Sequence, residues 1–278
     1  MAKVQSDPDI GVLVVGHGTR DPAGQAQMRN LACQTAGQLA PVITELAFLE
    51  LASPDIEQGV GRLAAAGVRR MVTLPVLLFR AGHALRDIPD AVAVAAKKYG
   101  IEVLAQTAPL EIQPSVVELS TERYRDALCQ AMGDAELAKI PPENIALAMI
   151  ARGSSSESAA DAMTRFAALR VESTPVGRHT VGYVAVRQPD VAATLDALGR
   201  TDAQILVVQP HLLFEGEVYH SLCQAVEERR LRDLASAEEA PTHRRRWVVC
   251  RPLGAAADDF DDERLAKVLA ELFHGECD

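Results

Sequence analysis

Three polar side chains recur at an even spacing in the first half of the chain. His17 stands between two glycines after an apolar run, Glu50 has a leucine on either side, and His83 follows a glycine; neighbouring members are 33 residues apart. Two imidazoles and a carboxylate suit a divalent transition metal, and so small a ligand set would leave the site open. Because a neutral imidazole also accepts protons near neutral pH, we expect a site that passes a metal on. The glycines around His17 would let a backbone segment and a bulky flat ligand approach closely.

A spacing of 33 residues matches one strand and one helix. In the first half we predict strands at 10–15, 42–51, 70–76 and 101–106, and helices at 22–39, 55–66, 84–99 and 111–132. Strict alternation indicates an α/β fold with a parallel sheet covered by helices on both faces. Ligands of such sheets bind beyond the carboxyl ends of the strands, where all three polar residues would lie.

The second half repeats the first at a fixed offset, with strands predicted at 145–150, 180–186, 203–209 and 247–251. Three pairs of equivalent residues are each 135 positions apart: His17 with Arg152, Glu50 with Ala185, and Phe79 with Phe214. The position equivalent to His83 holds Val218, so the second copy lacks all three donors. We predict two lobes of four strands each, at 1–139 and 140–278, with 133–143 as the linker.

A second motif pair sets the length of the later repeat. Pro109 recurs as Pro252, 143 positions on, so the second lobe holds eight more residues before this proline than the first. We place them near 227–246, in a charged, solvated helix end and loop.

Bulk properties exclude several classes of protein. A net charge of −10 and a pI near 5.2 argue against a nucleic-acid partner. The five cysteines have no close Cys-x-x-Cys spacing, which favours reduced thiols. Neither a basic leader nor an apolar run of membrane-spanning length is present, which predicts a cytoplasmic protein without membrane contact.

Several motifs together resemble one enzyme family. They are VVGHGTRD at 14–21, FLE at 48–50 with Pro54, PVLLF at 75–79, GH at 82–83 and DIP at 87–89. In this combination they resemble the class II chelatases of tetrapyrrole biosynthesis, the sirohydrochlorin cobalto- and ferrochelatases of the CbiX type, in their two-lobed form. The resemblance implies two chelatase-like lobes related by pseudo-twofold symmetry, with the tetrapyrrole in the cleft between them.

The same resemblance implies the chemistry of the polar residues. His17, Glu50 and His83 would bind the incoming Co²⁺, Fe²⁺ or Ni²⁺ and catalyse its insertion into sirohydrochlorin, with no permanently bound cofactor. One chain would carry one site and act as a monomer, because the duplication supplies both lobes.

Sirohydrochlorin carries many carboxylates, which arginine binds in a bidentate manner. We therefore predict a substrate-binding role for Arg20, Arg80 and Arg86 beside the first-lobe motifs, and for Arg152 in place of His17. Arg187 is a further cation in the second lobe, two residues after the position equivalent to Glu50. For Arg152, a solvated surface position remains an alternative.

Other functions stay open at this point. A tetrapyrrole or metal carrier could share the fold without turnover. The turn at 16–18 could bind phosphate at a helix N-terminus, as in a nucleotide sensor, although it lacks the lysine or third glycine of known fingerprints. His211 and His220 suggest a second metal site, for which a structural role is the alternative.

Overall fold

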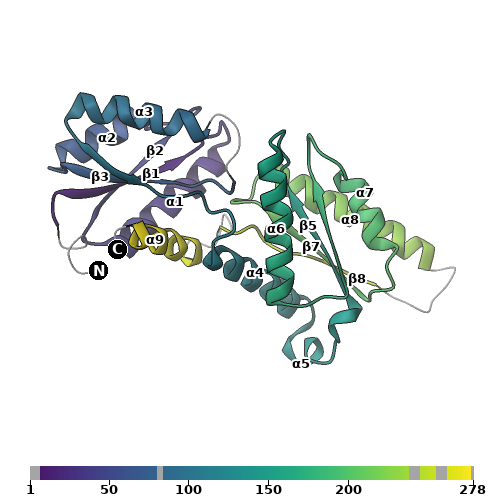
Figure 1. The fold of residues 1–278 in the computed structure, drawn as a ribbon. Coiled ribbons are helices and arrows are strands. Elements are labelled where there is room, and N and C mark those ends of the chain that lie inside the picture. Colours follow the sequence, from purple (N-terminus) through teal and green to yellow (C-terminus); the bar gives the residue numbers. More distant parts are fainter. Residues whose placement is uncertain (1–6, 80–83, 238–244, 255–261, 277–278) are drawn as a thin grey trace. The chain divides into compact units, whose positions relative to one another are not determined.

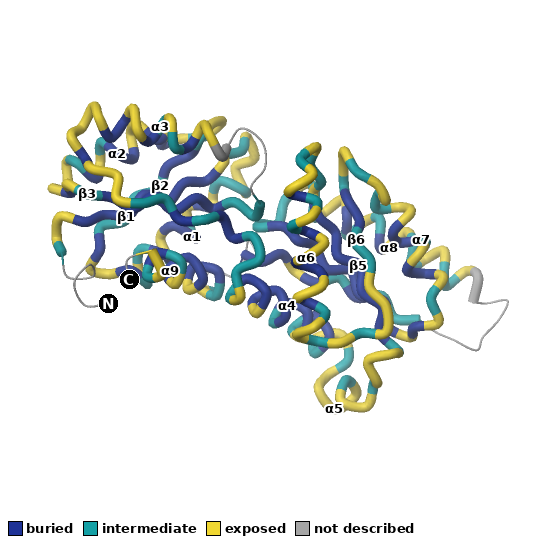
Figure 2. The backbone as a smooth tube through the Cα atoms, in the orientation of Figure 1, coloured by how far each residue is buried: buried dark blue, intermediate teal, exposed yellow. Residues whose placement is uncertain are grey.

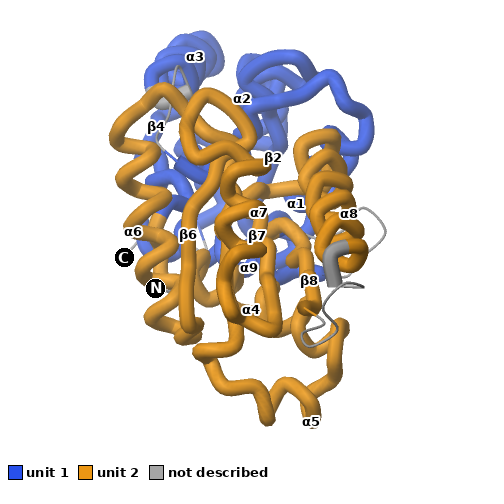
Figure 3. Tube along the Cα trace, turned by 90° about the vertical axis from the view of Figure 1, so that its right-hand side faces the viewer, with its two compact units in different colours: residues 1–111, 254–278 blue, residues 112–253 orange. Residues whose placement is uncertain are grey.

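The computed structural model describes residues 7–79, 84–237, 245–254 and 262–276. The chain divides into two compact units, one formed by 1–111 with 254–278 and the other by 112–253 (Figure 3). Each unit has one four-stranded sheet, and within both sheets all strand pairs are parallel. The predicted α/β fold with two four-stranded lobes is therefore confirmed.

The sheet of the first unit has the order β2-β1-β3-β4. Its strands are β1 (Ile10–Gly16), β2 (Ile43–Phe48), β3 (Arg70–Pro75) and β4 (Glu102–Gln106). All seven residues of β1 are buried, because helices cover both faces of the sheet.

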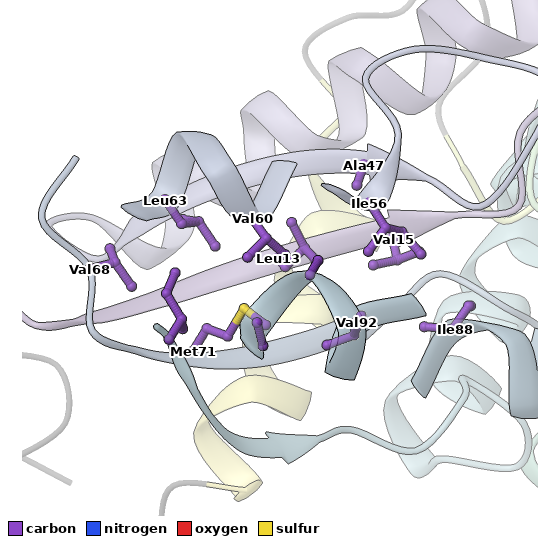
Figure 4. Packing of buried hydrophobic residues seen from close by; sticks show 13 residues of the cluster. Leu13, Val15, Ala47, Ile56, Val60, Leu63, Val68, Met71, Ile88 and Val92 are labelled. Atoms are coloured by element: carbon purple, nitrogen blue, oxygen red, sulfur yellow. The ribbon is translucent and has the colours of Figure 1, made fainter. Parts of the chain in front are cut away.

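Helices α2 (Ile56–Ala65) and α3 (Ala84–Tyr99) cover one face of this sheet (Figure 1). Figure 4 shows the core beneath them, where Leu13 and Val15 of β1 pack against Val60 of α2 and Val92 of α3. Complete burial of one such aliphatic side chain contributes about 1.5–3 kcal/mol. Helices α1 (Pro22–Leu39) and α9 (Arg264–Glu276) lie on the opposite face.

The second unit repeats this arrangement with the order β6-β5-β7-β8. Its strands are β5 (Ile145–Ala151), β6 (Arg178–Tyr183), β7 (Ile205–His211) and β8 (Arg246–Val249). One face packs against α7 (Val191–Gly199) and α8 (Glu217–Ala237), and the other against α6 (Glu157–Ser173) and α4 (Pro114–Met132). A short helix α5 (Asp134–Leu137) and a 3₁₀ turn (Pro142–Asn144) join α4 to β5.

The two units exchange their last helices, so the expected boundary at 139/140 does not match the compact units. Helix α4 follows β4 of the first unit but packs in the second, where Arg123 donates to the carbonyl of Leu253 at 2.8 Å. Helix α9 returns to the first unit, where it packs on α1 and β3. The division into compact units thus differs from the lobes drawn from the sequence repeat, because a local amphipathic pattern predicts a helix but not the sheet that it covers.

The expected linker at 133–143 consequently lies inside the second unit, as α5 and the 3₁₀ turn. Part of the predicted additional length lies in α8, which has 21 residues where α3 has 16. Burial follows the layers, with buried strands and exposed outer helix faces (Figure 2). Among the described helices, none is both long and apolar enough to cross a membrane.

Candidate functional site

His17 and Glu50 come together where β1 and β2 end. The two strands are paired with Gly16 opposite Phe48, and the pairing continues into the loops. The amide of Leu49 donates to Gly16 O at 2.9 Å, and that of Glu50 donates to His17 O at 3.0 Å. As a result, His17 Nδ1 lies 3.4 Å from Glu50 Oε1. The strand predicted at 42–51 in fact ends at Phe48, three residues earlier.

Gly18 makes this approach possible. Its φ is +97°, and a Cβ at this position would lie 1.8 Å from the carbonyl oxygen of Glu50. We expected the glycines around His17 to let a backbone segment and a flat ligand approach closely. At Gly18 the backbone that approaches closely is that of the chain's own Glu50 loop, as this expectation allows.

The loop that carries Glu50 is fixed at both ends. The amide of Phe48 donates to Pro54 O at 2.8 Å, and Asp55 caps α2 by accepting from the amide of Gln58 at 2.8 Å. Arg29 of α1 donates to Ser53 O. The backbone of this loop is therefore held in place by both neighbouring elements.

The pair can supply a metal ligand or a proton acceptor. Both side chains are about half exposed, at 49% for His17 and 54% for Glu50. A carboxylate beside Nδ1 favours a proton on that nitrogen, which leaves the lone pair of Nε2 available. No group of three metal-ligating side chains occurs among the residues that the structure describes. The predicted third donor, His83, lies outside those residues, so the full triad stays a prediction.

The predicted arginines are not gathered on the pair. Arg20 is exposed directly before the cap of α1, and Arg86 is exposed in the first turn of α3. Arg152 is exposed just after β5, and Arg80 lies outside the described residues. Their substrate-binding role stays a prediction.

The second unit keeps the backbone of the site without its donors. The amide of Ala185 donates to Arg152 O at 3.0 Å, as Glu50 does to His17. Gly153 has a φ of +92°, and its Cβ would lie 1.9 Å from Ala185 O. The duplicated scaffold thus places Arg152 and Ala185 where the first unit has its imidazole and carboxylate.

Arg187 has a structural role that the sequence did not show. It donates to Ser154 O at 2.6 Å and to Glu157 at 2.7 Å, and the bond to Glu157 raises the pKa of its guanidinium. The side chain ties the loop after β6 to the start of α6.

His211 and His220, the two histidines that suggested a second metal site, do not form a pair. His211 is buried at the end of β7, with its ring 4.2 Å from that of Phe166. Burial lowers the pKa of His211 to about 3, so the imidazole is neutral. His220 is exposed on α8. A structural role for His211 fits these surroundings.

Comparison with known proteins decides the family. The CbiX family model matches residues 11–127 and 146–271. The chain belongs to the CbiX family. Sirohydrochlorin ferrochelatase of Bacillus subtilis (strain 168) is 26% identical over 216 residues, which is 78% of this chain and 78% of that protein. Sirohydrochlorin cobaltochelatase of Priestia megaterium is 26% identical over 220 residues, covering 79% and 69%.

A solved structure shows the same fold. SirB from Bacillus subtilis with Fe³⁺ superposes with a TM-score of 0.77 at 22% identity, over 96% of this chain and 95% of that one. The predicted family and fold are confirmed.

Proposed function

We propose that this CbiX-family chain is an enzyme that inserts a divalent metal ion, Co²⁺ or Fe²⁺, into sirohydrochlorin. The observation that carries the proposal is the contact between His17 and Glu50 at the ends of paired strands. Relatives named as sirohydrochlorin chelatases support the choice of substrate.

Insertion of a divalent ion replaces two pyrrole N–H protons of the macrocycle, so the enzyme must handle a metal and release protons. His17 can bind the metal or accept a proton through Nε2, because Glu50 lies on the Nδ1 side of the ring. Glu50 also offsets part of the positive charge of the incoming ion. We assign His83 as the second imidazole, on the basis of its sequence position alone. The metal is a substrate here, and we propose that no permanent cofactor takes part.

The carboxylates of the substrate need cationic partners in a chain with a net charge of −10. We propose Arg20, Arg80, Arg86 and Arg152 for this role, since guanidinium groups form bidentate pairs with carboxylates. Replacement of Arg152 by Ala should raise KM for the tetrapyrrole and leave kcat unchanged; an unchanged KM would remove Arg152 from the site. We further propose that the chain acts as a monomer, because it carries both copies of the fold.

One experiment tests the function. The purified protein is mixed with sirohydrochlorin and Co²⁺, Fe²⁺ or Ni²⁺, and the absorption spectrum is followed against a reaction without protein. Catalysed insertion supports the chelatase, and competition between metals identifies the preferred ion. Tight binding of sirohydrochlorin without turnover would indicate a carrier, and the absence of any interaction would refute both.

A further inference from the structure

Leu51, next to Glu50, has an unusual combination of conformation and exposure. Its φ is +61°, in the left-handed region that favours glycine, and 49% of the residue is exposed. Val186 stands 135 positions later, with a φ of +69° and 74% exposure. Both copies of the fold therefore present a branched aliphatic side chain to solvent from a conformation that glycine would adopt more readily.

The surrounding contacts hold this conformation. On one side of Leu51, Glu50 is bonded to the carbonyl of His17; on the other, Ser53 accepts from Arg29 and Pro54 from Phe48. The turn needs a left-handed residue, but nothing in it needs a leucine, since the exposed side chain adds little to the core.

Comparison of the two copies separates this feature from the metal chemistry. The second unit has Arg152 and Ala185 in place of the imidazole and carboxylate. It nevertheless has an exposed aliphatic residue with a positive φ, Val186. An exposed aliphatic residue that is present both with and without the imidazole and carboxylate does not serve proton transfer or metal binding. An exposed apolar side chain at a strained backbone position, next to the proposed site, is instead suited to contact an apolar ligand surface.

We propose that Leu51 is a substrate-binding residue that packs against the apolar face of the tetrapyrrole macrocycle. This inference rests on the proposed function. A tetrapyrrole is a flat apolar ring with an anionic rim, and Leu51 is the apolar neighbour of the residue assigned to its metal. The leucine would hold the ring plane beside Glu50, while arginines bind the carboxylates of the rim.

Three variants test the proposal on the full chain. Leu51→Asn keeps the size of the side chain and tolerates a positive φ, but it is polar. Leu51→Met keeps an apolar contact. Val94→Ala is the control, because Val94 is 70% exposed on α3 of the same unit. Each is measured for the Kd of metal-free sirohydrochlorin, for KM and kcat of insertion, and for Tm.

Leu51→Asn should raise Kd and KM about five- to tenfold, as expected for loss of roughly half the burial of one leucine. Its kcat should stay near that of the parent chain and its Tm should not fall, because asparagine tolerates the positive φ better than leucine. Leu51→Met and Val94→Ala should bind normally. Unchanged binding by Leu51→Asn would overturn the proposal, and so would weakened binding that comes with a lower Tm. If the parent chain itself neither binds nor metallates sirohydrochlorin, the proposed function fails and this inference falls with it.

Discussion

Replacement of Gly18 by Ala should separate the geometry of the site from the stability of the fold. The new Cβ would lie 1.8 Å from Glu50 O, where ordinary contacts begin at 3.4 Å, so the Glu50 carbonyl must retreat by the difference. That movement breaks the hydrogen bond from the Glu50 amide to His17 O and strains the neighbouring bond from Leu49 to Gly16. The distance between the His17 and Glu50 side chains must then increase.

The magnitude follows from these contacts. An alanine with a positive φ costs about 1–2 kcal/mol, and two weakened hydrogen bonds cost about 1 kcal/mol each, so the unfolding free energy should fall by about 3–4 kcal/mol. For a chain of this size, that lowers Tm by roughly 10 °C. A displacement of more than about 1 Å at the reacting groups should lower kcat about 100-fold.

Gly153→Ala is the matched control, because its φ of +92° and its 1.9 Å clash with Ala185 O repeat the perturbation in the unit without the donors. Both variants should lose similar stability by thermal unfolding. Below both transitions, the metal-insertion assay should show a loss of kcat for Gly18→Ala only. Equal kcat values for the two variants would refute the assignment of the His17–Glu50 contact to catalysis.

Three further predictions concern single side chains. Glu50→Gln keeps the shape and removes the charge, so kcat should fall about 10- to 100-fold with KM for the tetrapyrrole unchanged; an unchanged kcat would contradict the role of the carboxylate. Arg170 is fully buried over the ring of Tyr124, its guanidinium nitrogens have no hydrogen-bond partner among the described residues, and burial lowers its pKa to about 10. Arg170→Met should therefore match or exceed the parent chain in urea unfolding, and a large loss of stability would disprove this. Burial lowers the pKa of His211 from the ordinary value of 6.5 to about 3 in the folded state. As pH falls, this histidine is therefore protonated first in the unfolded chain, and the parent chain should lose stability between pH 6.5 and pH 3. His211→Gln should lack this loss, with a slope of unfolding free energy about 1.4 kcal/mol per pH unit shallower in that window; equal slopes would show that burial does not shift this group.

The sequence predicted the sheets well because their signals are local. Buried central strands such as β1 are continuous apolar runs, and caps such as Asp21 mark where helices begin. The sequence also predicted that His17 and Glu50 lie close together, since parallel strands bring their carboxyl ends to one edge of a sheet.

What the sequence did not show depends on distant contacts or on backbone geometry. The exchange of α4 and α9 is set by which sheet each helix covers, and the two apolar faces look alike in sequence. The positive φ of Leu51 and Val186 has no signal in residue type, because aliphatic side chains normally avoid it. Only comparison of the two copies in three dimensions shows that the feature repeats.

The most direct test of the account is the rate of Co²⁺ and Fe²⁺ insertion into sirohydrochlorin by the His17→Ala and His83→Ala variants, followed by absorption beside the parent chain. Circular dichroism and a binding titration with metal-free sirohydrochlorin serve as controls for fold and substrate affinity. The account predicts that both variants fold and bind the tetrapyrrole but no longer insert metal. Near-normal insertion rates in both variants would contradict it.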